Sequence, residues 1–222
     1  MQDASGEKGR AGGDATSAAV AFATTEHFVL QSARASTISE STGRSTMFLG
    51  AVSGGLIALG LVATASHVGT PFTIFALVLL PSLAFVGLVT FERVLQTGIA
   101  DYSYALRITR LRGYYFDKAP ELSSYLARGT RVDRQQAQGA WSWRWQQFLT
   151  IAGAVGVITA VLIGAAAGLL AGTVSALGPW AALGVGTFVG GAVLILLMRR
   201  QRTVWNRYIA EPLFGDEPTE SR

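Results

Sequence analysis

Two long stretches of the chain contain no Lys, Arg, Asp or Glu. The first comprises the 47 residues between Arg44 and Glu92, and the second comprises the 54 residues between Arg144 and Arg199. Both are rich in Leu, Val, Ala and Gly. An apolar helix of roughly 20 residues crosses the hydrocarbon core of a bilayer, whereas 47 residues would form a helix about 70 Å long. Each stretch therefore predicts two membrane spans that turn back once.

Each uncharged stretch has a cluster of polar residues, glycine and proline near its middle, and such clusters mark turns. The first turn is predicted at 66–71 and the second at 172–179. Pro71 and Pro179 suit the first turn of a returning helix, and Pro81 predicts a kink within its span. The predicted spans are about 46–66, 72–91, 148–170 and 180–198.

The remaining segments predict a small helical portion outside the membrane. Leu95, Ile99, Tyr102 and Leu106 recur at helical spacing, which favours an amphipathic helix within 92–147. The predicted fold is an all-α membrane protein with four transmembrane helices arranged as two hairpins. Amphipathic cytoplasmic helices are expected before the first span and between spans 2 and 3. The other predicted segments are a disordered tail at 1–25, a juxtamembrane helix at 26–45 and a C-terminal tail at 199–222.

Charge supports this topology. Only 14% of the residues are charged, against about 25% in soluble domains. Neither predicted turn contains Lys or Arg, whereas arginines flank the other ends of the spans. The positive-inside rule then places both termini and the central loop in the cytoplasm, and the expected location of the spans is a bacterial inner membrane. Four tryptophans are predicted to anchor the chain at the interface: Trp141, Trp143, Trp145 and Trp205.

Several classes of chemistry are not expected. The chain has no cysteine, and His27 and His67 lie far apart without an acidic cluster, so neither a metal site nor a cofactor is predicted. No nucleophile motif is present, and an enzyme is not expected. The predicted spans contain no ionisable side chain, which disfavours proton-coupled transport.

Small residues recur every four positions in three of the spans. Such strips let helix backbones approach closely in a membrane. They predict either packing within one subunit or an interface in a homo-oligomer, which includes the lining of a pore. The strip residues are Gly50, Gly54, Gly156, Ala160, Gly164, Gly168, Gly172, Gly186 and Gly190.

Basic residues gather in the central segment. They are candidates for contact with anionic lipid headgroups, an anionic small ligand or a cytoplasmic protein, and the alternative is a solvated helix face that only sets topology. Because the positive charge adjoins membrane spans, no nucleic-acid partner is expected. The candidate residues are Arg107, Arg110, Arg112, Lys118, Arg128, Arg131 and Arg134.

The block from Glu92 to Ile99, continued by Arg107 to Tyr115, resembles uncharacterised bacterial multi-pass proteins with four spans. The segment from Phe28 to Arg34 shares this resemblance, which covers 26–200 and implies no particular activity. The first hairpin with its flanking helices is also similar in layout to two-span effector modules of bacterial conflict systems.

These features favour an oligomeric channel or pore-type module with a basic cytoplasmic mouth. The small-residue strips, the uncharged spans and the arginine-rich helices support this interpretation. One alternative is a non-conducting membrane scaffold or signalling partner that binds lipid or protein through 93–140. Another is a stress effector that permeabilises the membrane.

Overall fold

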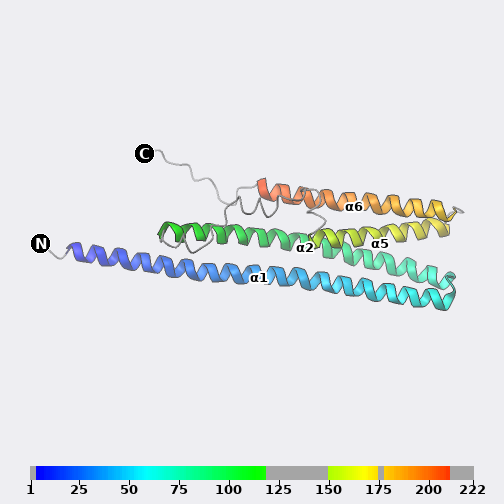
Figure 1. Cartoon of the computed structure of the whole chain (residues 1–222), viewed down its shortest axis with the longest axis horizontal. Helices are drawn as coiled ribbons and strands as arrows, with labels where there is room; N and C mark the ends of the chain where they lie inside the picture. Colours follow the sequence, from blue (N-terminus) through cyan, green and yellow to red (C-terminus); the bar gives the residue numbers. More distant parts are fainter. Residues whose placement is uncertain (1–3, 119–149, 175–177, 211–222) are drawn as a thin grey trace. The chain divides into compact units, whose positions relative to one another are not determined.

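The computed structural model describes residues 4–118, 150–174 and 178–210. Within these ranges the chain forms four helices, drawn in Figure 1: α1 (Ala4–Ser66), α2 (Thr70–Lys118), α5 (Ile151–Val174) and α6 (Pro179–Ala210). Each contains a segment long and apolar enough to cross a membrane. The prediction of an all-helical chain with four such helices is therefore confirmed. The membrane that the chain occupies and its orientation there stay predictions.

The chain divides into two compact units. One comprises Met1–Ser39 and Ala100–Ala140, and the other comprises Glu40–Ile99 and Trp141–Arg222. Because charged residues are frequent in the first and rare in the second, we call them the polar unit and the apolar unit. Helices α1 and α2 contribute residues to both, and the described parts of α5 and α6 belong to the apolar unit.

Helix α1 begins earlier than the sequence predicted. The segment 1–25 was expected to be a disordered tail, but α1 starts at Ala4 and continues without a break through 26–45 to Ser66. No proline occurs before Pro71, so nothing removes a helical hydrogen bond over this length. The alanines of the first 25 residues also favour a helix. At 63 residues, α1 is about 95 Å long, roughly three times the thickness of a hydrocarbon core.

A tight reversal joins α1 to α2 at residues 67–69, inside the turn predicted at 66–71. The backbone N–H of Val68 donates to the carbonyl oxygen of Ala63 at 3.0 Å, which is the long bond of a Schellman motif. His67 and Val68 have φ angles of 51° and 57°, in the region that side chains with a Cβ rarely adopt. Pro71 is the second residue of α2, and Pro179 is the first of α6.

The core of the apolar unit draws side chains from all four helices. Phe48 of α1, Phe91 and Leu95 of α2, and Thr159 of α5 are the most fully buried large side chains. Met198 of α6 joins the same cluster. Helix α2 continues through Pro81, whose side chain is exposed. The candidate residues of the apolar unit lie on the four helices that share this core.

Candidate functional site

In the polar unit, one ion pair joins α1 to α2. The Arg34 guanidinium donates to the Asp101 carboxylate from Nε at 2.8 Å and from Nη2 at 3.5 Å. The Asp101 side chain is about one-third exposed. Leu30 and Ile108 are buried in the same unit, one and two helical turns away along their respective helices. The pair therefore links α1 to α2 beside a small number of buried apolar side chains.

His27 lies in the same helix pair. Its ring meets the edge of Tyr115 at 6.2 Å between ring centroids, and the Gln31 amide donates to its Nε2 atom at 3.0 Å. In the neutral ring this leaves the proton on Nδ1. That Nδ1 atom is buried and has no hydrogen-bond partner within the part of the chain that the structure describes. A buried, unsatisfied ring nitrogen weakens this contact relative to a fully paired one.

The candidate basic residues of α2 do not form one compact patch. Arg107, Arg110, Arg112 and Lys118 are all exposed. Arg107 and Lys118, eleven residues apart, lie on nearly the same side of the helix, whereas Arg112 lies about 140° round from Arg107. The Lys118 ammonium lies 5.9 Å from the centre of the Tyr114 ring, within the range of a cation–π contact. The other candidates, Arg128, Arg131 and Arg134, lie outside the described residues.

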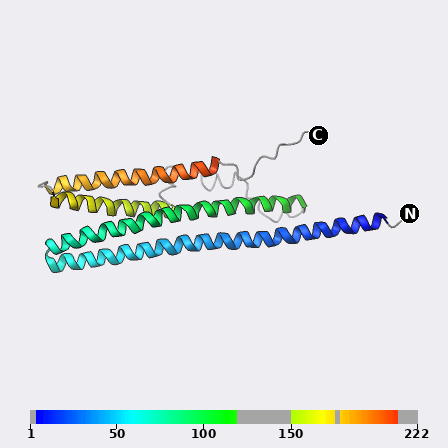
Figure 2. The same ribbon diagram turned by 180° about the vertical axis from the view of Figure 1, so that it is seen from behind.

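The glycines of α5 and α6 pack against each other's backbone. A Cβ atom on Gly164 would lie 2.7 Å from the carbonyl oxygen of Gly186, and one on Gly186 would lie 2.7 Å from the carbonyl oxygen of Gly164. Gly168 and Gly190 continue the contact, which reaches the Ala160 and Ala182 carbonyls. Figures 1 and 2 show α5 and α6 side by side from opposite directions. This part of the predicted small-residue strip therefore contacts the same chain.

The remaining strip glycines have different surroundings. A Cβ on Gly156 would meet the side chains of Phe91 and Met198 at 3.2 Å, and one on Gly172 would meet the Ala182 Cβ at 3.4 Å. No atom lies within 4 Å of the corresponding position on Gly50 or Gly54. The small-residue strip of α1 therefore has free space beside Gly50 and Gly54, whereas the glycines of the α5 strip lie against other helices.

A close three-helix contact in the core was missed from the sequence. A Cβ on Gly87 of α2 would collide with the Thr159 Oγ1 atom of α5 and would lie 3.0 Å from the Phe48 ring of α1. Thr159 is completely buried, and its hydroxyl donates to the Val155 carbonyl oxygen at 2.7 Å. Gly87 belongs to no four-residue strip of small residues. The only signal in the sequence is a lone glycine among large apolar residues.

Hydroxyl groups in the apolar unit bond to their own helices. Thr90, Thr159 and Thr187 each donate to the backbone carbonyl four residues earlier. Ser82 and Thr64 do the same. Such back-bonding is common where Ser and Thr lie in apolar helices. As donors these hydroxyls are satisfied by their own helices, and each oxygen keeps its acceptor capacity.

A shallow groove of about 630 Å³ lies between α5 and α6 on the face bordered by the glycine contact. Its lining is apolar apart from Thr187 and includes Val161, Leu183 and Leu194. Lipid tails are the ordinary neighbours of such a surface in a membrane.

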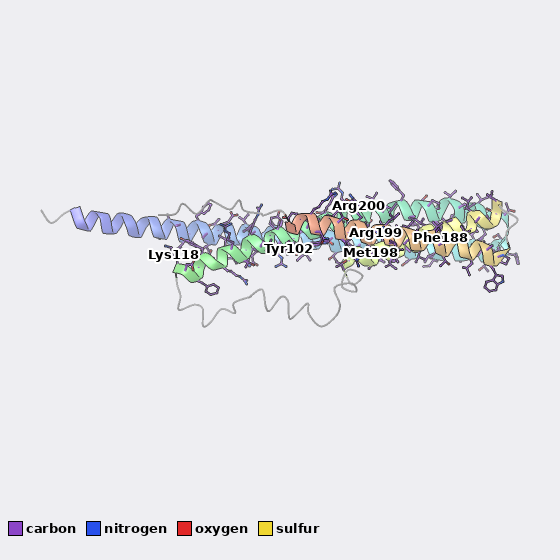
Figure 3. The ribbon with its side chains drawn as sticks, turned by 90° about the horizontal axis from the view of Figure 1, so that it is seen from above. Tyr102, Lys118, Phe188, Met198, Arg199 and Arg200 are labelled. Atoms are coloured by element: carbon purple, nitrogen blue, oxygen red, sulfur yellow. The ribbon has the colours of Figure 1, made fainter. Side chains whose placement is uncertain are left out.

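At the charged end of the apolar unit, α6 bonds to α2 and lies near the start of α5. The Arg200 guanidinium donates to both carboxylate oxygens of Glu92, at 2.8 and 3.1 Å. Figure 3 shows Arg199 and Arg200 as neighbours on α6. The buried Gln201 donates to the Thr150 hydroxyl oxygen at 3.2 Å. These polar contacts lie where the uncharged stretches end.

The predicted interfacial anchors fall into two groups. Trp205 is half-buried against the core, and its ring lies 3.7 Å from the position of a Cβ on Gly98. Trp205 therefore packs against α2, in addition to its predicted role as an anchor at the membrane interface. Trp141, Trp143 and Trp145 lie outside the described residues.

Among the described residues, no three His, Asp or Glu side chains gather as metal ligands. The chain matches no protein-family model, no curated protein and no solved structure. Its function must therefore be argued from its own geometry.

Proposed function

We propose that this protein is a non-conducting integral membrane scaffold or signalling partner whose polar unit binds another protein. The observation that carries the proposal is a set of large apolar side chains turned to solvent on the polar part of α1. Phe22 is 73% exposed, Phe28 is 69% exposed, and Val29 is also exposed. Phe22 and Val29, seven residues apart, lie on nearly the same side of α1, and exposed large apolar side chains that share a helix face are typical of binding surfaces.

The length of α1 supports a position outside the hydrocarbon core for these residues. The helix is about three times longer than that core is thick, and Glu26, Arg34 and Glu40 lie in its first part. The uncharged part after Arg44 fits the membrane, which leaves Phe22 and Phe28 beyond it. Because these side chains are not needed to face lipid, a protein partner is their simplest occupant.

The small-residue strips of α5 and α6, which favoured a channel, have another explanation. The α5 and α6 glycines contact each other within one chain. The span hydroxyls donate to their own backbones. Neither feature needs a pore.

The proposal is tested by combining bilayer recording with crosslinking in cells. We expect the purified protein to give no conductance steps across voltage, tension and salt. A photo-crosslinking residue near Phe28, at Thr25, should capture a discrete partner, and F22S/F28S should abolish that product. The matched control, S32A/S36A, changes two exposed polar residues of the same helix and should leave the product intact. Reproducible conductance, or a crosslink insensitive to F22S/F28S, would contradict the proposal.

The channel remains the second candidate, and the open face of α1 favours it. Gly50 and Gly54 have no neighbour within 4 Å of a Cβ position, and Met47, Ile57 and Leu61 on that face are exposed. Small residues at four-residue spacing suit contact with a second membrane helix. A homo-oligomer joined through this face, with conductance that G50L/G54L removes, would favour the channel over the scaffold.

A further inference from the structure

A second groove lies in the apolar unit between α1 and α2, with a volume of about 300 Å³. Met47 and Phe48 line it from α1, and Phe85, Val86 and Val89 line it from α2. Phe85 is 67% exposed, so the groove opens sideways towards the surroundings of the helix pair. Apart from Arg44 and Thr90 its lining is apolar, which suits a hydrocarbon chain.

One end of this groove is positively charged. Arg44 lies on its rim. Arg93 lies one helical turn beyond Val89 on the same side of α2, and its side chain is exposed. Arg44 and Arg93 therefore belong to the parts of α1 and α2 at the same end of the groove.

The groove begins at the depth where a lipid changes from headgroup to hydrocarbon. Arg44 is the last charged residue before the first uncharged stretch, and Glu92 and Arg93 are the first after it. The lining runs from Arg44 to Phe48 on α1 and from Thr90 to Phe85 on α2, about 6–8 Å along the helices. The polar end and the apolar wall thus follow each other in the same order as in a phospholipid.

The neighbouring carboxylates leave these arginines able to bind an anion. Glu92 is held by Arg200 through both of its oxygens. Glu40 accepts from Arg44 Nε at 2.8 Å, but both side chains are nearly half exposed. An exposed pair of this kind contributes little to stability, so a phosphate can replace Glu40 at small cost.

From this arrangement we infer that the α1–α2 groove binds one anionic phospholipid. Its phosphate is held between Arg44 and Arg93, and one acyl chain lies along Met47, Phe85 and Val89. The site is separate from the candidate basic residues of the polar unit and does not depend on the proposed protein partner. Charge complementarity at a matched depth is what selects an anionic lipid over a neutral one.

The test is lipid retention by the full-length protein. The protein is reconstituted in vesicles of equal phosphatidylglycerol and phosphatidylcholine, extracted in mild detergent, and its bound lipids are counted by native mass spectrometry. We expect one phosphatidylglycerol to be retained in preference to phosphatidylcholine. R44Q and R93Q should each lower that retention about fivefold, as expected for loss of one near-surface charge. R44K should retain most of it.

Two further variants separate the groove from general surface charge. V89W keeps both arginines but fills the groove, and it should also lower retention. R199Q removes an exposed arginine of α6 outside the groove (Figure 3) and should have no effect. Unchanged helical content and thermal transition by circular dichroism identify folded variants. Equal retention of the two lipids, an effect of R199Q as large as that of R44Q, or full retention by R44Q/R93Q would overturn the inference.

Discussion

The polar unit and the apolar unit are built on the same two helices, α1 and α2, but different interactions hold each together. In the polar unit, the Arg34–Asp101 pair and the His27–Tyr115 contact supplement a few buried apolar side chains. In the apolar unit, four helices share one core, and glycines bring backbones into direct contact. Exposed ion pairs contribute about 0–1 kcal/mol each, whereas errors in close packing cost about 1–3 kcal/mol.

This difference indicates that the two units open at different free energies. Regions with few buried apolar contacts open locally below the free energy of global unfolding. The polar unit therefore belongs to the easily opened part of the chain, which suits a segment that binds a partner. The apolar unit is expected to open at a higher free energy than the polar unit.

The largest expected effect comes from placing a side chain in the α5–α6 contact. G164I directs a branched side chain at the Gly186 carbonyl, where even a Cβ would lie 2.7 Å away. Because backbone must move, we expect a loss of about 3 kcal/mol in the free energy of unfolding, measured by titration with SDS in mixed micelles. The control is G184I on α6, where no atom lies within 4 Å. Equal losses of unfolding free energy in G164I and G184I would show that contact between the glycine backbones does not decide the cost of a side chain.

The three-helix contact at Gly87 gives the next largest effect. G87A introduces a methyl group against Thr159 Oγ1 and the Phe48 ring, and we expect a loss of about 1–3 kcal/mol. T159A removes the opposing hydroxyl. A double-mutant cycle should therefore show that G87A costs less in the T159A background, by 0.5 kcal/mol or more. Strict additivity would show that the two residues do not touch.

A substitution in the reversal at residues 67–69 is expected to raise the free energy of unfolding. Val68 is a β-branched residue with a φ of 57°, a conformation that costs residues with a Cβ about 1–2 kcal/mol. V68G should raise the free energy of unfolding of the apolar unit by about 1 kcal/mol, measured in the same titration. V62G, in the body of α1, is the control and should destabilise. A loss on V68G would show that its side chain makes contacts that outweigh the strain.

The smallest expected loss of stability comes from a substitution in the polar unit. D101N removes the carboxylate that Arg34 binds and should cost about 0.2–1 kcal/mol, less at high salt. Hydrogen exchange should quicken in the polar part of α2 but stay unchanged in α5 and α6. E40Q, which breaks a pair within α1 alone, should leave exchange in α2 unchanged. If D101N instead speeds exchange throughout, the two units do not open independently.

The apolar helices were predictable because their signals are local. A long run without charge predicts a span, and Pro71 and Pro179 stand in the first turns of α2 and α6. The start of α1 was not predicted. The first 25 residues lack an apolar period, and the absence of proline together with the alanines allowed a helix that periodicity could not reveal.

The partners of the small residues were also beyond the sequence. Gly54 and Gly164 belong to strips with the same four-residue spacing, yet the first is open and the second touches backbone. Spacing defines a face of a helix but not what lies against it. The sequence likewise gave no sign that Gly87 is in close contact, because the residues that it meets, Phe48 and Thr159, lie on other helices.

The reversal at residues 67–69 also bears on how the chain is inserted into a membrane. Only three residues separate the end of α1 from the start of α2, so the second apolar segment emerges from the ribosome directly behind the first. No connection is long enough to cross the bilayer before the second segment follows. We expect α1 and α2 to enter the membrane together, as a single unit of biogenesis.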